Sequence, residues 1–119
     1  MTMVNEQHAF LQDVAKLLQE AEKQGFMVSG GELFRTPDQQ AIYLKTGRSK
    51  TMASKHLQRL AIDLNLFVKK ADGSAALTYD ILTLKPLGDF WEKLSPGKNS
   101  WGGNWNSFKD VPHFERRTT

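Results

Sequence analysis

The stretch Ser54–Leu64, with the sequence SKHLQRLAIDL, decides how the middle of this 119-residue chain folds. It contains a histidine and an aspartate, His56 and Asp63, seven residues apart. Its apolar residues fit a helix, but from residue 60 to residue 68 every second residue is aliphatic, which fits a strand equally well. We predict a strand over residues 60–68, because Asp63 then lies on the face opposite the aliphatic row, where a cleft can form.

The rest of the chain predicts helices, one further strand and turns within a single domain. Apolar spacing and helix-end residues indicate three helices, over residues 5–24, 36–45 and from about 79 or 85 to 94. A short buried strand is expected over 26–28, and turn residues occupy 29–31, 69–74 and 95–99. The length suits one compact core, so we expect one domain over residues 1–119, with the segment 1–25 as an N-terminal helix.

The composition excludes several classes of protein. Hydrophobic residues make up 39% and charged residues 24%, and no apolar run approaches the ~18 residues that a membrane span needs. There is no cysteine, which excludes disulfides and thiolate sites, and the first residues lack the pattern of a secretory signal. We therefore expect synthesis and folding in a cytoplasm, without membrane insertion. The net charge of +3 suits a polyanionic partner such as nucleic acid or cell-wall polymer, or simply a solvated basic surface.

Three residues have the chemistry of a catalytic zinc site. Such a site takes three ligands from His, Asp or Glu, and His56, Asp63 and His113 can supply them. Asp110, three residues before His113, can act as the base that takes a proton from water, and Arg35, just before a predicted helix, can stabilise an oxyanion. Spacing alone leaves open the alternative that both histidines are structural.

The combination of motifs resembles a known family, the zinc peptidases of family M15. These include D-alanyl-D-alanine carboxypeptidases and phage endolysins that cut the L-alanyl-D-glutamate bond of peptidoglycan. The resemblance covers residues 26–115, and its C-terminal part is especially similar to the endolysins. The motifs are Ser54-x-His56, Ala61-x-Asp63, Trp101-Gly102-Gly103-x-Trp105 and Asp110-x-Pro112-His113-Phe114.

The resemblance implies an α+β fold and a zinc centre. Helices would pack on a small, mainly antiparallel sheet that carries the zinc cleft, as in Hedgehog and DD-peptidase domains. The implied zinc ligands are His56, Asp63 and His113. Asp110 would be the general base, and Arg35 would polarise the substrate.

Further residues take their expected roles from the same resemblance. Gln39 would be the motif neighbour of the polarising arginine, and Ser54 would orient the first ligand or the substrate. The segment from Trp101 to Trp105 would form part of the cleft wall, with core packing as the alternative role of its two tryptophans, and its glycines would let a peptide approach the backbone. Arg59 departs from the family, which commonly has glycine there; a required positive φ would strain it.

The function implied by the resemblance is zinc-dependent hydrolysis of a peptidoglycan stem peptide, most of all at L-alanyl-D-glutamate. The alternatives are a D-alanyl-D-alanine carboxypeptidase and a non-catalytic wall-binding or virion protein with a structural metal site. We expect a monomeric phage or prophage lysis protein that stays in the cytoplasm until host lysis, with a holin as partner for export. Nucleic acid is not an expected partner.

Overall fold

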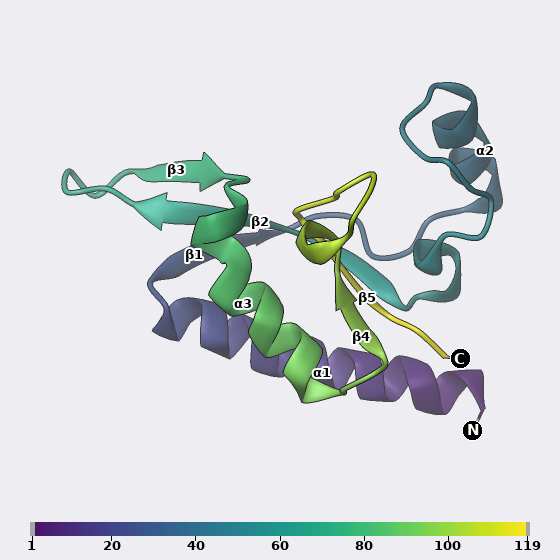
Figure 1. The fold of residues 1–119 in the computed structure, drawn as a ribbon, viewed down its shortest axis with the longest axis horizontal. Helices are drawn as coiled ribbons and strands as arrows, with labels where there is room; N and C mark the ends of the chain where they lie inside the picture. The colour runs from purple at the N-terminus through teal and green to yellow at the C-terminus, as the bar shows by residue number, and fades with distance from the viewer. Residues whose placement is uncertain (1, 119) are drawn as a thin grey trace.

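The computed structural model describes residues 2–118, which form helices around a five-stranded antiparallel sheet (Figure 1). The α-helices are α1 (Met3–Lys23), α2 (Pro37–Lys45) and α3 (Ile81–Leu94), with short 3-10 helices η1 (Lys55–Gln58) and η2 (Gly102–Asn104). The strands are β1 (Phe26–Gly30), β2 (Ala61–Lys69), β3 (Ala75–Thr78), β4 (Asn99–Trp101) and β5 (His113–Arg116).

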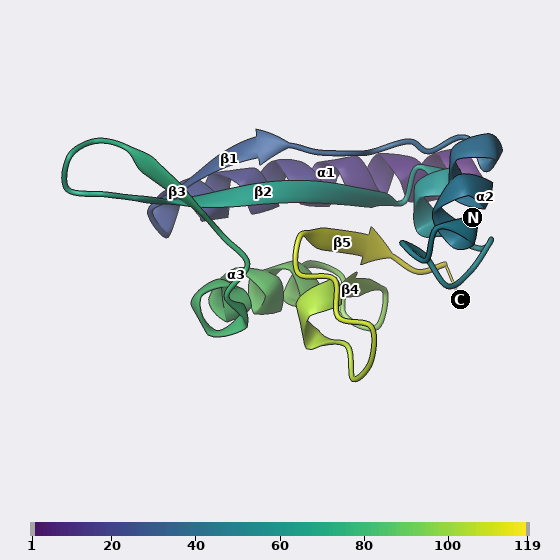
Figure 2. The same ribbon diagram turned by 90° about the horizontal axis from the view of Figure 1, so that it is seen from above.

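The strand β2 is the centre of the sheet, whose order is β1-β2-β5-β4. Along one edge β2 pairs with β1, from Leu64 to Val68. Its other edge is shared, because β5 pairs with residues 61–63 and β3 with residues 66–69. Figure 2 shows β2 running between β1 and β5. The predicted strand over residues 60–68 is confirmed, with a shift of one residue.

The apolar core joins the two long helices to the sheet. Phe10 of α1 packs edge-on against Trp91 of α3, with ring centroids 5.7 Å apart. Trp91 in turn packs against Phe114 of β5 at 6.0 Å. All three side chains are buried, so the face of β5 that carries Phe114 is fixed against the helices. Residues on the opposite face of β5 are then directed away from this core.

The helix ends follow the sequence closely. Thr2 caps α1, and Gly25 follows its end with a φ of +90°, as the predicted helix over 5–24 requires. Thr36 caps α2 by accepting a hydrogen bond from the Gln39 backbone N–H at 3.1 Å. Asp80 caps α3, which contains Pro86 in its interior. No helix among residues 2–118 has the length and apolar content of a membrane-spanning segment.

Two local predictions were wrong. Residues 29 and 30 belong to β1, where they pair with Asn65 and Leu64, so the expected turn at 29–31 begins later than predicted. The strand β3 was not expected, although it follows the correctly predicted Asp-Gly turn in which Gly73 has a φ of +86°. Its four residues are too few for a clear period-two pattern, and β2 determines its position through pairing.

Candidate metal centre

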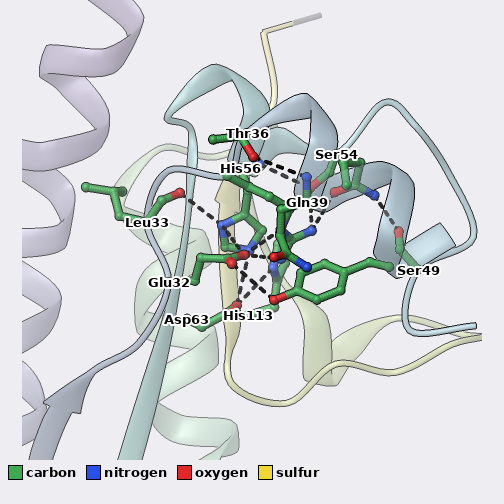
Figure 3. Close-up of polar contacts among 12 residues, drawn as sticks. Glu32, Leu33, Thr36, Gln39, Ser49, Ser54, His56, Asp63 and His113 are labelled. Carbon is green, nitrogen blue, oxygen red and sulfur yellow. Dashed lines mark hydrogen bonds and ion pairs between the residues drawn. The ribbon is translucent and has the colours of Figure 1, made fainter. Parts of the chain in front are cut away.

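Three side chains converge on one point, as Figure 3 shows: His56, Asp63 and His113. Asp63 Oδ1 lies 3.3 Å from His56 Nε2 and 3.3 Å from His113 Nδ1. One candidate ligand atom from each residue lies within 4.8 Å of the other two. The arrangement thus joins residues that are up to 57 positions apart in the sequence.

The sheet register brings two of these residues together. Asp63 of β2 and His113 of β5 are directly paired across the antiparallel ladder. Their side chains therefore lie on the same face, which is the face opposite the Leu64 side chain in the core. The period-two pattern that predicted β2 is thus the physical reason that Asp63 faces the site.

The 3-10 helix η1 supplies the third residue. Ser54 caps this helix by accepting a hydrogen bond from the His56 N–H at 3.2 Å. His56 is 1% exposed, so its ring is held inside the protein beside the start of β2. Ser54 therefore orients the backbone of the first candidate ligand.

Arg59 ends η1 in the left-handed conformation, with a φ of 58°. This conformation costs a non-glycine residue roughly 1–2 kcal/mol, which explains why glycine suits the position. The guanidinium of Arg59 lies 4.0 Å from the centre of the Phe34 ring, a cation–π contact that offsets part of the cost. The chain therefore accommodates arginine without losing the turn between His56 and Asp63.

Hydrogen bonds on the outer side of each imidazole fix its orientation. His56 Nδ1 lies 3.0 Å from the Leu33 carbonyl oxygen, so this nitrogen carries the proton and Nε2 presents its lone pair to the centre. Among residues 2–118, buried His56 Nε2 makes no hydrogen bond, and its contact with the Asp63 carboxylate oxygen at 3.3 Å is an ion-pair distance only. His113 Nε2 lies 2.8 Å from Glu115 Oε1, so the other ring nitrogen of His113, Nδ1, faces Asp63. Metal-ligating histidines are held in the same way.

The donor set fits a zinc ion. Zinc accepts two imidazole nitrogens and one carboxylate oxygen, with a further position left for water or substrate. The unpaired nitrogen of His56 is a second indication, because a buried polar atom without a partner is costly unless something binds it. The residues present therefore suit the metal that the sequence predicts.

The charges at the centre are strongly coupled. Burial alone would lower the pKa of His113, but hydrogen bonds with Asp63 and Glu115 outweigh it and raise the pKa to about 9. Burial opposes ionisation of Asp63, yet its contacts with His113 and His56 hold its pKa well below the usual range. The centre without metal therefore holds a proton on His113 and a charge on Asp63 at neutral pH.

Asp110 stands beside the three residues at the mouth of the site. Its Oδ2 lies 3.8 Å from His113 Nδ1, and its side chain is about half exposed. Burial raises the pKa of Asp110 above the ordinary value, although the His113 charge opposes the shift. A carboxylate that is accessible and more basic than usual is suited to accept a proton from water.

Arg35 lies on the other side of the site, where it is held by three residues. Its guanidinium forms an ion pair with Glu32 and donates hydrogen bonds to Gln40 Oε1 at 2.7 Å and to Ser54 Oγ at 3.3 Å. The side chain is 11% exposed. Arg35 is therefore a fixed positive charge at the edge of the centre.

These residues line a cleft of about 230 Å³. One wall is the segment 48–56, which connects α2 to η1, and the opposite wall carries Trp105, Phe108 and Asp110. His56 and His113 are also among the residues that line it. The two candidate histidine ligands, Asp110 and Arg35 thus line one cavity, and Asp63 contacts both histidines from the side of β2.

Trp101 does not form the cleft wall as predicted. It is fully buried, stacks on Phe114 with centroids 6.5 Å apart, and donates a hydrogen bond from Nε1 to the Val111 carbonyl at 2.7 Å. It therefore supports the segment that carries Asp110 and His113 from behind. The tryptophan in the cleft is Trp105, whose ring lies 5.2 Å from that of His113.

The two glycines after Trp101 also serve a different purpose from the one expected. A Cβ on Gly102 would lie 2.0 Å from the Asp110 carbonyl oxygen, and a Cβ on Gly103 would lie 2.3 Å from the Trp101 ring. Both glycines are buried. Glycine is required at residues 102 and 103 because the protein packs closely around both of them. The expected approach of a substrate peptide to the backbone of these two residues is not the reason.

The neighbour of Arg35 is Gln40, and not Gln39 as the sequence had suggested. Gln39 contacts Thr36 through its backbone N–H, whereas Gln40 is the residue that accepts from Arg35. Gln40 is fully buried, and its amide nitrogen donates to Ser49 Oγ at 2.8 Å and to the Thr51 carbonyl at 2.6 Å. No spacing rule distinguishes these adjacent glutamines before the direction of α2 is known.

Two further carboxylates of the site, Glu32 and Glu115, were not predicted from the sequence. Glu115 could have been found, because residues i and i+2 of a strand share a face and His113 begins β5. Glu32 lies in an irregular segment after β1, where the sequence carries no such signal.

Comparisons with known proteins agree with this geometry. Residues 47–116 match a peptidase M15 family model described as D-alanyl-D-alanine carboxypeptidase. The L-alanyl-D-glutamate peptidase of Listeria phage A118 is 33% identical over 105 residues, which are 84% of this chain and 34% of that protein. This chain thus spans about a third of the length of that curated relative.

A solved structure confirms the predicted fold class. The L-Ala D-Glu endopeptidase ChiX of Serratia marcescens matches with a TM-score of 0.66, over 88% of this chain and 78% of its own. The identity is 23%, so this likeness shows a shared fold. The M15 peptidases are zinc metallopeptidases, and the His-Asp-His group agrees with that chemistry. Because the family model covers more than half of its residues, this chain belongs to the M15 peptidase family.

Proposed function

We propose that this chain is a zinc-dependent peptidase that cuts a stem peptide of peptidoglycan between L-alanine and D-glutamate. The observation that carries the proposal is the convergence of His56, Asp63 and His113 within 4.8 Å, beside a cleft that both histidines line together with Asp110 and Arg35. The names of the Listeria phage relative and of the Serratia structure support the choice of bond.

His56 Nε2, Asp63 Oδ1 and His113 Nδ1 would hold the zinc ion, with Leu33 and Glu115 fixing the two imidazole rings. Zinc, when bound, supplies a Lewis acid that lowers the pKa of a water molecule to about 7. The carboxylate of Asp63 makes the ligand set singly negative, which helps to compensate the charge of the ion.

Asp110 would accept the proton of the attacking water and return it to the amine that leaves. Its exposed carboxylate reaches the cleft, and its backbone N–H donates to the Gly102 carbonyl at 3.1 Å. This contact, together with the support from Trp101, holds the base at one place relative to His113. Proton transfer needs such fixed geometry as much as a suitable pKa.

Arg35 would stabilise the negative charge that develops on the carbonyl oxygen of the scissile bond. Gln40, Ser54 and Glu32 hold its guanidinium at the edge of the cleft, so little reorganisation is needed when the charge forms. Ser54 contacts both Arg35 and His56, and thereby fixes the arginine relative to the first ligand.

The test of the function is digestion of purified peptidoglycan by the zinc-loaded protein. New N-terminal glutamate, identified by end-group labelling and mass spectrometry, is the expected product. A second candidate, D-alanyl-D-alanine carboxypeptidase, is favoured by the description of the matching family model. Release of free D-alanine without new N-terminal glutamate would establish that candidate and overturn the first.

We also propose the biological setting that the sequence suggests. Residues 1–119 would act as one catalytic domain, monomeric, with helix 1–25 packed on the core of residues 26–115. The protein would be a phage or prophage lysis protein that meets the wall through a holin or after lysis. A wall-binding protein without catalysis is the remaining alternative, and a protein that binds peptidoglycan but releases no peptide fragments would support it.

We expect Glu115→Ala to weaken zinc binding about 10–100-fold, because His113 then loses the carboxylate that fixes its ring. Glu115→Gln is the matched control, since its amide oxygen can still accept a hydrogen bond from His113 Nε2. The zinc affinity of Glu115→Gln should therefore fall less than that of Glu115→Ala. Competition with a fluorescent chelator measures both affinities. Equal affinities for Glu115→Ala and the unmodified protein would show that the contact does not support the site.

Zinc affinity should fall as the pH falls below 9, because zinc must displace the proton that His113 holds with a pKa of about 9. Asp63 is already ionised throughout this range, since its pKa is lowered. One displaced proton changes the affinity tenfold per pH unit, so binding at pH 6.5 should be about 30-fold weaker than at pH 8.0. Titration calorimetry in two buffers of different ionisation enthalpy would count the protons released, and a pH-independent affinity would contradict the expectation.

A further inference from the structure

One wall of the cleft carries three cationic side chains, Arg48, Lys50 and Lys55. Across the described residues, none of the three forms an ion pair with a carboxylate. Arg35, on the same cleft, is by contrast paired with Glu32. The segment 48–55 is named the basic loop here, and its charges are free to meet a negatively charged ligand.

The basic loop is held in place by the protein around it. The Tyr43 carbonyl accepts from the backbone N–H groups of Arg48 at 2.8 Å and of Ser49 at 3.1 Å. Buried Gln40 binds Ser49 and Thr51 with its amide nitrogen and Arg35 with its oxygen. One side chain thus connects the basic loop to the candidate oxyanion-stabilising arginine, so their relative position is fixed.

Lys50 reaches across the cleft. Its ammonium lies 4.7 Å from the centre of the Phe108 ring, which belongs to the opposite wall. Phe108 is 44% exposed and has a φ of 48°, an unfavourable backbone conformation for an aromatic residue. This contact places a positive charge over the mouth of the cleft, within the space that a bound peptide would enter.

The proposed substrate has a negative charge close to its scissile bond. In the stem peptide, D-glutamate is linked onward through its γ-carboxyl group, so its α-carboxylate is free and lies one carbon from the scissile nitrogen. Two carboxylates that are not candidate zinc ligands, Asp110 and Glu115, also line the cleft, so this group needs a cationic partner away from them. The free cations of the cleft are on the basic loop, which therefore offers the favourable contact.

We propose that the basic loop is a subsite for this free carboxylate, with Lys50 and Arg48 as its main contacts. The inference rests on the proposed function and adds a specificity to it: stem peptides with D-glutamate are preferred over those in which the α-carboxylate is amidated to D-isoglutamine. The two peptides differ by one charge and have almost the same shape.

The test compares L-Ala-γ-D-Glu-L-Lys with its D-isoglutamine counterpart. For the unmodified protein, we expect kcat/KM to be about tenfold higher with the acid, as for one charge-assisted contact. The double variant Arg48→Gln/Lys50→Gln should reduce this preference to less than about threefold, by lowering kcat/KM for the acid alone. Lys69→Gln/Lys70→Gln removes the same charge at the β2–β3 hairpin, distant from α2 in Figure 1, and should keep the preference.

Binding to the Asp110→Asn protein gives a second measurement that does not depend on turnover. Calorimetry should show tighter binding of the acid than of the amide, and the basic-loop substitutions should remove the difference. Equal kcat/KM for both peptides, or a preference for the acid that survives in Arg48→Gln/Lys50→Gln, would overturn the proposed subsite. Neither result would contradict the proposed peptidase function. Variants that lose only retention on whole cell walls would assign the loop to wall polymer instead. Failure to cleave either peptide or peptidoglycan would overturn the proposed function, and the subsite with it.

Discussion

Replacing Asp110 with asparagine is expected to lower kcat about 10²–10⁴-fold while zinc content stays unchanged. The substitution keeps the shape of the side chain but removes the proton acceptor at the mouth of the cleft. Asp110 is not one of the three converging residues, and its carboxylate oxygen Oδ2 lies 3.8 Å from His113 Nδ1. Peptide hydrolysis followed by chromatography gives kcat, and metal analysis gives the zinc content of the same samples.

Asp38→Asn is a suitable control for this experiment. Asp38 is exposed in the first turn of α2 and does not line the cleft. The kcat of the Asp38→Asn variant should therefore match that of the unmodified protein. If Asp110→Asn retains full kcat with zinc bound, a different group takes the proton and the proposed role of Asp110 is wrong. A variant that loses zinc as well as activity would instead place Asp110 among the metal-binding residues.

Gly102→Ala is expected to impair both stability and catalysis. The added methyl carbon would lie 2.0 Å from the Asp110 carbonyl oxygen and 3.1 Å from the Asp110 Cβ, so the backbone at Asp110 must move. Overpacking of this kind costs about 1–3 kcal/mol in the free energy of unfolding. Displacement of the base by about 1 Å can lower kcat roughly 10²-fold. Chemical denaturation and steady-state kinetics would measure the two effects separately.

Gly30→Ala is the matched control, because it makes the same chemical change in a strand with open space around it. A Cβ on Gly30 would meet no atom within 4 Å. Its effect on the free energy of unfolding should therefore stay within about 1 kcal/mol, with kcat unchanged. If Gly102→Ala behaves like Gly30→Ala, close packing on Asp110 is not what requires glycine at residue 102.

Much of the fold and the site could be predicted because the determining signals are local. The alternating aliphatic residues of β2 predicted that the Asp63 side chain lies on the face opposite the aliphatic row. Thr36 indicated the start of α2, and Gly25 indicated the end of α1. His56, Asp63 and His113, which spacing and family resemblance singled out as candidate ligands, lie together in the structure, and their role as zinc ligands stays a prediction. Each of these choices depends on residue type and position within one element.

The errors concern contacts that depend on how distant elements pack. Trp101 and Trp105 are four residues apart, and only the turn at η2 places one in the core and the other in the cleft. Gln39 and Gln40 are adjacent, and the direction of α2 relative to Arg35 decides which one is buried. Spacing in the sequence contains neither piece of information, since both depend on the tertiary structure.

The divided edge of β2 has a consequence for the order in which the protein becomes active. Residues 61–63 of β2 have no partner on this edge until β5 is made, some 50 residues later in synthesis. Domains generally fold as the chain emerges, N-terminal parts first. His113 is the last of the three converging residues to appear, so a chain that ends before residue 113 lacks the full set. Such a shortened chain could not assemble the proposed metal centre, whatever part of the rest had folded.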